Sequence, residues 1–358
     1  MSSKRVRGTY LKYFIVALVA VLHLGCARRQ SVGNSPQLVV GSWGGAYQEA
    51  QRKAYFQPFA RETGIKIIET STPEYGKFYE WQRSSSASAD VVDVETYFVL
   101  EAGRKGALQP IDYNVVPKSN MLPAALNEFG VASCAYADVI AWNSKLHPDW
   151  KDMTWADFWN TKKYEGARGL RDLPASTLEA ALLADGVSPE SLYPLDVTRA
   201  FRSLNRLRSS TRLALWSSGS EPIEWLLTGA VSLTTAWNGR VHDAQQSGQP
   251  ISMTFHNGMV DWLWWVVPRY SKNRDLAMKF IAFTLRPDRQ AEFARDIPYG
   301  PTNIAALRLL DPQTAASLPT AQENLKQEIL RDNKWWADHN EEIQPRWQEW
   351  KLGLGAHR

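Results

Sequence analysis

The sequence predicts an α/β protein folded into two lobes, and three observations lead to this prediction. The chain has 358 residues, enough for two compact domains that each bury a core. Hydrophobic residues make up 44% and charged residues 22%, as in ordinary soluble proteins. Short apolar strands alternate with helical segments along most of the chain. Strands separated by helices favour sheets that are largely parallel.

The first half of the chain opens with a predicted strand at 38–41 and a turn at Trp43-Gly44-Gly45. A helix follows at about 46–63, and Gly64 supplies its stop signal. Further elements are strands at 65–68, 90–94 and 139–142, a helix at 100–105 that ends at Gly106, and a short helix at 154–159.

The second half continues the same alternation. The expected elements are a helix at 197–208, strands at 231–236, 251–255 and 264–267, a helix at 275–285, and solvent-exposed helices between 321 and 352.

The first 26 residues have the three parts of a secretory signal peptide. Four basic residues precede an apolar run at 13–22 that is too short to span a bilayer, and small residues follow it. Two processing sites stay open. His23-Leu24-Gly25-Cys26 resembles a lipoprotein signal in which Cys26 receives the lipid, whereas Gly25-Cys26-Ala27 permits ordinary cleavage after Ala27. Residues 27–37 are expected to form a tether, on the periplasmic or cell-surface side of the membrane.

Cleavage changes the charge and the cysteine count. The whole chain carries a formal charge of +4, and cleavage before Cys26 removes four basic residues and no acidic ones, which leaves zero. The charge therefore gives no reason to expect nucleic-acid binding. Cys134 has no second structural cysteine to pair with, so we expect a small buried side chain there and no internal disulfide.

Aromatic and acidic residues recur where the predicted strands end. Trp43 follows the first strand, Glu95-Thr96-Tyr97 follows the strand at 90–94, and Trp237-Asn238-Gly239 follows the strand at 231–236. Asp261-Trp262 is expected in a loop just before the strand at 264–267. Loops at strand ends are where α/β folds bind ligands, so the pattern predicts a binding site.

Four strings carry a resemblance to a known family. They are VGSWGGAY at 40–47, ADVVDVETY at 89–97, AWNG at 236–239 and IPYGPTN at 297–303. Their order and spacing resemble those of spermidine/putrescine-type extracellular solute-binding proteins. The resemblance implies a type II periplasmic-binding-protein fold, in which two hinged α/β lobes enclose a ligand cleft.

The expected lobe boundaries follow from that resemblance. Lobe I would comprise 38–139 and 264–306, and lobe II would comprise 140–263 and 307–358. The chain would cross between them near 137–143 and 261–268.

The resemblance also implies which residues contact the ligand. In that family, aromatic side chains enclose a methylene chain and carboxylates bind its ammonium ends. The implied contacts are the aromatic residues Trp43, Tyr97, Trp237, Tyr299 and Trp336 and the carboxylate of Asp261. Three further expected contacts come from this sequence itself: Trp262 beside a predicted strand, Glu95 where relatives often have a hydroxyl residue, and Asp172 in a segment that departs from the family's acidic positions. The expected ligand is putrescine or spermidine, delivered by a monomer to a membrane ABC permease. An anion, a sugar or an amino acid derivative stays open as the ligand.

Catalysis has little support in the sequence. The chain lacks a Gly-x-Ser-x-Gly elbow, a phosphate-binding Gly-x-x-x-x-Gly-Lys loop and a dinucleotide-binding Gly-x-Gly-x-x-Gly turn. Its six His residues are scattered without ligand spacing. We therefore expect no catalytic residue, no cofactor and no metal site. An exported hydrolase on the same two-lobed scaffold stays open, because a fold alone does not determine a function.

Overall fold

The computed structural model describes residues 36–71 and 74–355. From Gln37 onward the chain forms one compact unit. The predicted signal peptide, Cys26 and most of the predicted tether lie outside the described residues. Among the described residues, no helix is both long enough and apolar enough to cross a membrane.

One mixed sheet of eleven strands organises the described part of the chain, and its main path runs β2-β1-β3-β9-β5-β8-β6-β7. A first parallel group consists of β1 (Gln37–Ser42), β2 (Lys66–Ser71) and β3 (Val91–Glu95). A second parallel group consists of β6 (Arg168–Arg171), β7 (Leu213–Trp216) and β8 (Leu233–Trp237).

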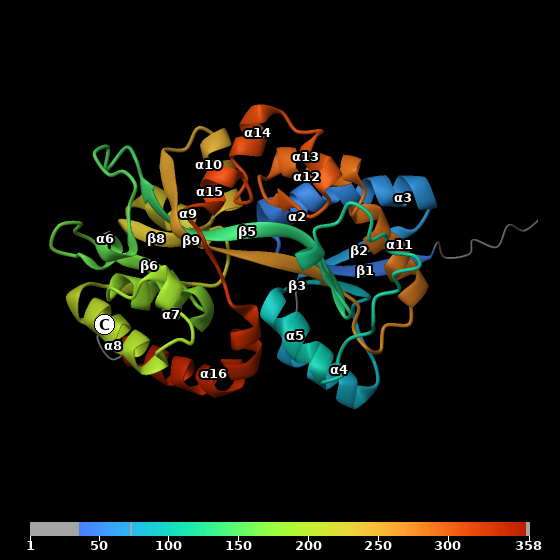
Figure 1. The fold of residues 1–358 in the computed structure, drawn as a ribbon, viewed down its shortest axis with the longest axis horizontal. Coiled ribbons are helices and arrows are strands. Elements are labelled where there is room, and N and C mark those ends of the chain that lie inside the picture. Colours follow the sequence, from blue (N-terminus) through green and yellow to red (C-terminus); the bar gives the residue numbers. More distant parts are fainter. Residues whose placement is uncertain (1–35, 72–73, 356–358) are drawn as a thin grey trace, which may run out of the picture. The chain divides into compact units, whose positions relative to one another are not determined.

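Two long antiparallel strands join these groups. They are β5 (Gly130–Asn143) and β9 (Ile251–Val266), which pair with each other along most of their length. In Figure 1 they cross the middle of the molecule between the two groups. β3 pairs with β9 and β8 with β5. Both long strands therefore belong to both halves of the sheet. The predicted lobe boundaries, which divide the chain at 139/140 and 263/264, stay a prediction. The short strands β4 (Leu126–Asn127), β10 (Gly300–Pro301) and β11 (Ile329–Leu330) pair with β5, β5 and β9.

Helices cover both groups of strands (Figure 1). Those of the first group are α2 (Gly45–Gln51), α3 (Gln57–Thr63), α4 (Gly76–Ser84), α5 (Thr96–Arg104), α11 (Arg274–Thr284) and α12 (Pro287–Asp296). Those of the second group are α6 (Trp155–Trp159), α7 (Pro174–Ala184), α8 (Val197–Ser210), α9 (Glu221–Thr228) and α10 (Asn238–Gln246). The C-terminal part adds α13 (Ile304–Leu307), α14 (Pro312–Ala316), α15 (Gln322–Leu325) and α16 (Asn333–Gly355). Short 3-10 turns lie at Pro123–Ala125 and Pro189–Ser191.

The helix predicted at 46–63 is present over nearly its whole length. It consists of α2 and α3, joined by a π-helical turn at Arg52–Phe56. Gly64 ends it with a φ of 72°, the left-handed conformation that glycine adopts without steric cost. Tyr47, Ala54 and Phe59 of this segment are buried in the core.

Three differences from the prediction bear on the binding site. β9 is one strand of 16 residues where two strands and a loop were expected, so Asp261 and Trp262 lie inside a strand. Trp237 is the last residue of β8, and α10 begins at the next residue, so no loop follows it. In addition, β6 (Arg168–Arg171), β7 (Leu213–Trp216) and the helices α4, α7, α9, α10 and α12 were not predicted.

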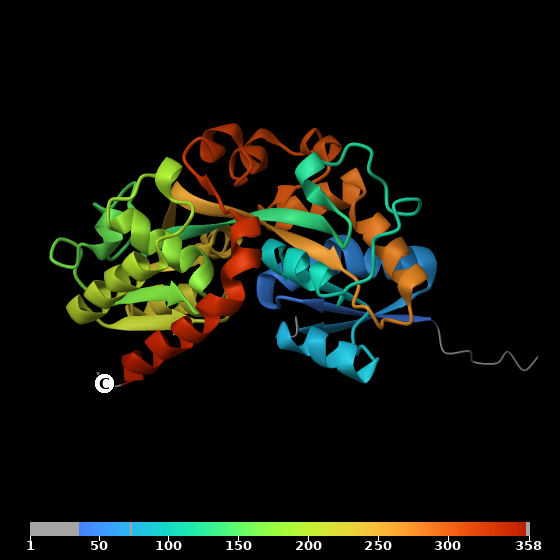
Figure 2. The same cartoon turned by 60° about the horizontal axis from the view of Figure 1, so that its bottom comes forward.

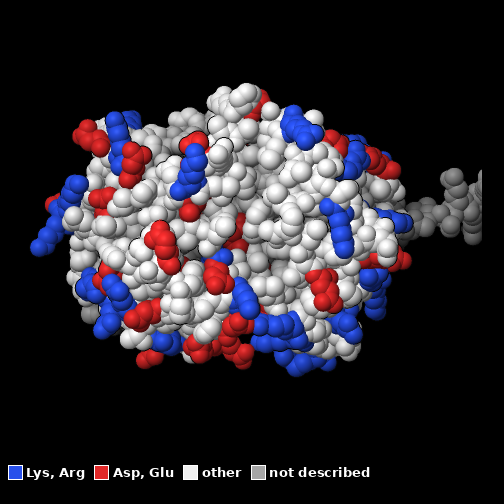
Figure 3. All heavy atoms as spheres, in the orientation of Figure 1, with Lys and Arg blue, Asp and Glu red and all other residues white. Residues whose placement is uncertain are grey.

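Many of the 16 tryptophans of the chain are buried in the core. Trp155, Trp216, Trp265, Trp336 and Trp347 are among the largest fully buried side chains. The exposed helices expected between 321 and 352 are therefore only partly exposed, because α16 buries one side against the rest of the fold. Cys134 is buried on β5, as predicted. Figure 3 shows acidic and basic side chains interspersed on one face of the molecule, in keeping with a charge near zero.

Candidate functional site: a cavity at the strand ends

A small cavity lies between the two parallel groups of strands, and we call it the inner cavity. Its lining consists of Trp43, Tyr47, Glu95, Tyr136, Arg171, Trp237, Arg240, Leu263 and Tyr299. The centre of a water-sized sphere has only about 10 Å³ in which to move there. That space suits about one water molecule, so a larger solute enters only if the lining moves apart.

The strand order explains why these side chains meet. Glu95, Arg171 and Trp237 are the last residues of β3, β6 and β8, and Trp43 directly follows β1. Carboxyl ends of parallel strands line the crevice in which open α/β sheets bind ligands. Gly44 and Gly45, with φ values of 69° and 55°, turn the chain sharply from Trp43 into α2.

Aromatic rings form most of the cavity wall, and Trp237 lies at their centre. Its ring centroid lies 6.1 Å from that of Trp43, 6.4 Å from that of Tyr136 and 5.2 Å from that of Trp216. The guanidinium carbon of Arg171 lies 5.0 Å from the Trp237 centroid, within reach of a cation–π contact.

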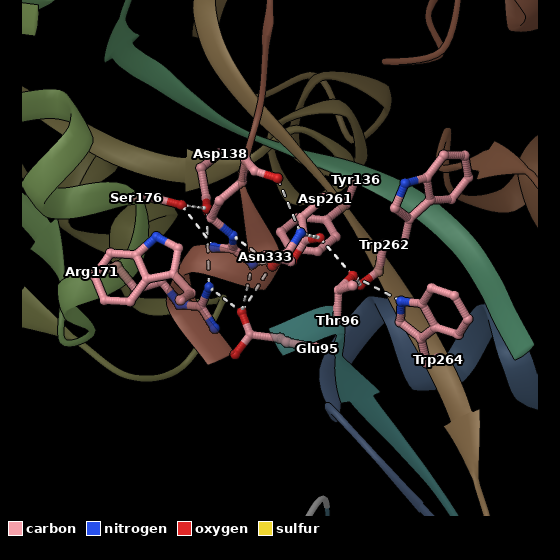
Figure 4. A network of polar contacts seen from close by, with 12 residues as sticks. Glu95, Thr96, Tyr136, Asp138, Arg171, Ser176, Asp261, Trp262, Trp264 and Asn333 are labelled. Carbon is pink, nitrogen blue, oxygen red and sulfur yellow. Dashed lines mark hydrogen bonds and ion pairs between the residues drawn. The ribbon is translucent and has the colours of Figure 1, made fainter. Parts of the chain in front are cut away.

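Glu95 is the acidic residue of the lining, and two arginines neutralise it. Its Oε1 accepts hydrogen bonds from Arg171 Nη1 at 2.9 Å and from the Tyr136 hydroxyl at 3.0 Å (Figure 4). Arg331 Nη2 lies 3.6 Å from the same oxygen. Burial raises the pKa of Glu95, but the two guanidinium groups outweigh burial and hold that pKa below its usual value.

Asp261 lies behind this pair and binds Arg331. The fully buried Arg331 donates a hydrogen bond to Asp261, which also accepts from Asn333 Nδ2 and Thr96 Oγ1, both at 2.7 Å (Figure 4). Burial raises the pKa of Asp261 despite Arg331. Asp261 does not line the inner cavity, and Arg331 links it to Glu95, which does.

Three buried N–H groups of the lining donate no hydrogen bond within the described part of the chain. They are Trp43 Nε1, Trp237 Nε1 and Arg240 Nε. Arg240 uses Nη2 to donate to the Gly44 carbonyl at 2.7 Å. Burial lowers the pKa of Arg240, because its charge is poorly solvated there. Buried donors without acceptors cost free energy, so these groups favour a ligand that brings acceptors.

A wider space adjoins the inner cavity and shares Trp43, Glu95 and Arg171 with it. We call this space, of about 490 Å³, the vestibule. Its lining also includes Tyr97 and Asp172, and it includes side chains of α16.

The structure brings together only some of the residues that the sequence predicted as ligand contacts. Trp43, Glu95, Trp237 and Tyr299 line the inner cavity, and Tyr97 and Asp172 line the vestibule. Asp261, Trp262 and Trp336 line neither space.

Trp336 is fully buried and donates from Nε1 to Glu179 at 2.6 Å, which explains its distance from the cavity. Asp172 does not pair with its neighbour Arg171. Instead, it accepts a hydrogen bond from Lys351 Nζ at 2.6 Å.

Arginines are the functional residues that the sequence reasoning missed. Arg171 ends β6 and Arg240 lies in the first turn of α10, and neither element was expected. Arg331 follows the two-residue strand β11, which has no sequence signal of its own. No local pattern singles out Arg171, because the strand that positions it reads Arg168-Gly169-Leu170-Arg171 and has no apolar run.

Comparison with known proteins identifies the family. Residues 54–320 match the family described as bacterial extracellular solute-binding protein. The gamma-aminobutyric acid-binding protein of Pseudomonas aeruginosa is 36% identical over 324 residues, which cover 88% of this chain and 91% of that protein. The spermidine/putrescine-binding periplasmic protein of Escherichia coli is 29% identical over 296 residues, with coverages of 79% and 82%.

Solved structures show the same fold. The binding protein AgtB of Agrobacterium tumefaciens R10, in complex with agropinic acid, superposes with a TM-score of 0.83 at 33% identity. An ABC transporter substrate-binding protein from Bradyrhizobium japonicum USDA 110 superposes with a TM-score of 0.82 at 34% identity. Each match covers 88% of this chain and 99% of the other.

These matches confirm the predicted periplasmic-binding-protein fold and the prediction that the chain is not an enzyme. They confirm the family resemblance, but not the restriction to polyamine-binding members. The chain belongs to the bacterial extracellular solute-binding proteins, and it is the substrate-binding component of an ABC transporter.

Proposed function

We propose that this chain captures a small amino-acid-like solute, with one carboxylate and one amino group, in the inner cavity and delivers it to a membrane ABC permease. The observation that carries the proposal is the set of three buried, unpaired donors: Trp43 Nε1, Trp237 Nε1 and Arg240 Nε. A carboxylate offers acceptors to several donors at once, and charge-assisted hydrogen bonds are the stronger kind.

The acidic groups near the cavity argue against a diamine. Glu95, Asp172 and Asp261 were expected to bind ammonium ends, yet each already pairs with Arg171, Lys351 or Arg331. Glu95 is the acidic residue in the inner lining, so a second ammonium would have no carboxylate there. The amino acid derivative that the sequence left open is therefore better supported than putrescine or spermidine.

Asp138 does not supply the carboxylate that a second ammonium group would need. One of its oxygens has no hydrogen-bond partner in the described structure, but it does not line the inner cavity. Burial raises its pKa, which favours the neutral form over the charged form that would bind a cation.

One amino group is well accommodated. Among the described residues, Glu95 Oε2 has one hydrogen-bond contact, a long one of 3.4 Å with the Tyr75 hydroxyl, so it keeps acceptor capacity. The rings of Tyr136, Trp237 and Tyr299 supply faces that attract a cation. A zwitterion would therefore place its carboxylate near Arg240 and its ammonium near Glu95. The names of similar proteins, which refer to gamma-aminobutyric acid and agropinic acid, agree with a carboxylate-bearing ligand.

Isothermal titration calorimetry with matched ligands tests the proposal. 4-Aminobutanoate, putrescine and butyrate share a four-carbon chain but differ in their charged ends. We expect the order 4-aminobutanoate, then butyrate, then putrescine, with at least a tenfold gap, about 1.4 kcal/mol, between the first and the last. Putrescine binding more tightly than every carboxylate in a wider panel of amino acids would overturn the proposal.

We also propose that Cys26 carries a lipid anchor, since the lipoprotein-like signal precedes a polar tether. Replacing Cys26 with Ser should release the protein from the membrane fraction in soluble form. A wild-type mature chain that begins at Arg28 and carries no lipid would contradict this proposal.

A further inference from the structure

A buried network of charged side chains lies beside and behind the inner cavity. It consists of the carboxyl groups of Glu95, Asp138 and Asp261 and the guanidinium groups of Arg171 and Arg331, and all five residues are buried. The network therefore has one more carboxyl group than guanidinium groups. A buried charge is costly unless it is paired, so the excess carboxyl group needs either a cation or a proton.

The network joins segments that are far apart in the sequence. Glu95 ends β3, Arg171 ends β6, and Asp138 lies in β5. Asp261 lies in β9, and Arg331 lies between β11 and α16, the helix that Figure 2 shows in red between the two halves of the molecule. Glu95 and Arg171 also line the inner cavity, so a ligand there can change the charge balance of the whole network.

Asp138 is the least paired carboxyl group of the network. Glu95 and Asp261 each accept a hydrogen bond from an arginine. Asp138 Oδ2 accepts one from Ser176 Oγ at 2.6 Å, whereas Oδ1 has no partner within the described residues. A buried oxygen without a partner costs less on a neutral carboxyl group than on an ionised one. The proton therefore belongs on Asp138, and two carboxylates then balance two guanidinium groups.

The surroundings of Asp138 leave its charge sensitive to nearby groups. The charged and titratable groups that face it are two guanidinium groups, a carboxylate and two phenols: Arg171, Arg331, Glu95, Tyr136 and Tyr299. Burial raises the pKa of Asp138 by more than the two arginines lower it. Burial also raises the pKa of both phenols, so they stay neutral. A closer guanidinium group would favour the ionised form of Asp138.

Arg171 is the group that can come closer, because it lies between two carboxyl groups. Its Nη1 is 2.9 Å from Glu95 Oε1 and 4.0 Å from Asp138 Oδ2, and dashed lines in Figure 4 join it to both. A ligand ammonium beside Glu95 would share that carboxylate and repel Arg171. A shift of about 1 Å would then bring Nη1 within hydrogen-bond distance of Asp138.

We infer that an ammonium group bound beside Glu95 transfers Arg171 to Asp138 and releases the Asp138 proton to solvent. The O–H bond of the Asp138 carboxyl group breaks, the proton passes to the buffer, and the resulting carboxylate accepts a hydrogen bond from Arg171. One positive charge arrives and one leaves, so the charge balance is kept. This inference rests on the proposed function, because the ligand must bring an ammonium group to Glu95.

Titration calorimetry of the full-length protein with 4-aminobutanoate tests the inference. The measurement is made near neutral pH in phosphate and in HEPES, whose ionisation enthalpies differ. We expect the buffer dependence of the heat to report release of about one proton per ligand molecule, and Kd to fall by up to about tenfold for each unit by which the pH rises. Butyrate has the same carbon chain without the ammonium group, so its binding should release no proton.

Two matched variants locate the proton. Asp138→Asn has no carboxyl proton to lose, so it should remove both the proton release and the pH dependence of Kd. Glu179→Gln is the control, because Glu179 is also a buried carboxyl group with an oxygen that lacks a partner in the described structure. Its other oxygen accepts from Tyr193 at 2.5 Å and from Trp336 at 2.6 Å, away from Arg171. This variant should release as many protons as the wild type.

The outcomes separate the inference from the function on which it rests. Binding of 4-aminobutanoate with the same heat in both buffers would refute the proton release and leave the proposed function intact. Equal release with butyrate would refute the role of the ammonium group, and undiminished release in Asp138→Asn would refute the role of Asp138. The two wild-type comparisons decide the matter even where a variant folds poorly. Binding of putrescine without binding of 4-aminobutanoate would overturn the proposed function and the inference with it.

Discussion

Replacement of Arg240 by Met separates ligand binding from folding. Arg240 is 6% exposed, and its Nε has no partner within the described structure. The variant removes a poorly solvated charge from the unliganded protein and one hydrogen bond, from Nη2 to the Gly44 carbonyl. The lost hydrogen bond costs about 1 kcal/mol, and relief of the buried charge offsets it by at least as much. The melting temperature without ligand should therefore stay the same or rise.

Binding should respond in the opposite direction. Truncating one partner of a buried charge pair costs about 2–5 kcal/mol of binding free energy. That loss corresponds to a rise in Kd of roughly 30-fold to several thousand-fold. Titration calorimetry with the carboxylate ligand measures this rise, and differential scanning fluorimetry without ligand measures the stability.

Arg168 provides the matched control. It is also buried, but it donates to the carbonyls of Phe158 at 2.8 Å and Gly166 at 2.5 Å, and it does not line the inner cavity. Arg168→Met should lower the free energy of unfolding by a few kcal/mol, because it leaves buried carbonyls unsatisfied, and should preserve the Kd. Wild-type affinity in Arg240→Met, or a loss of stability as large as that of the control, would refute the assignment of Arg240 to the ligand carboxylate.

Three further outcomes follow from the structure. Asp261→Asn should lower the free energy of unfolding by about 3–5 kcal/mol with or without ligand, because the fully buried Arg331 loses its nearer charged partner and keeps Glu95, 3.6 Å away. Chemical denaturation that shows wild-type stability would contradict this. Gly219→Ala should weaken ligand binding at least tenfold, because the added methyl group would lie 2.7 Å from Trp237 Cζ3 and displace that ring. A wild-type Kd in titration calorimetry would contradict this and show that the ring can move freely. Burial raises the pKa of Asp93 to about 7, so the folded protein keeps a proton that the unfolded chain releases near pH 4. The free energy of unfolding should therefore fall as the pH rises from about 4 to 7. Asp93→Asn should reduce this dependence of the free energy of unfolding on pH. An equally steep dependence in the variant would exclude Asp93 as its source.

Much of the fold and part of the site could be predicted from local patterns. The strands that end at Ser42, Glu95 and Trp237 are short apolar runs, and residues at their carboxyl ends meet in any open α/β sheet. Trp43, Glu95 and Trp237 were identified for that reason, and all three line the inner cavity.

The interpretation of Asp261 failed because its surroundings are decided by pairing between distant segments. Asn257 and Gly258 look like a break between two strands, and Asn257 does have a φ of 54°. The register between β5 and β9 shifts at this point, and the two strands remain paired on both sides of the shift. Asp261 consequently lies within a continuous strand.

The sequence by itself determined the α/β class, the family and the aromatic character of the site, because periodicity, strand-end residues and short motifs are local properties of the chain. Only the tertiary structure decided the charge of the site. Glu95 meets Arg171 across 76 residues of sequence, and Asp261 meets Arg331 across 70. Which carboxylate is neutralised, and which N–H is buried without an acceptor, depends on such long-range contacts. That distribution of paired acids and unpaired donors favours a carboxylate ligand over the diamine that the motifs implied.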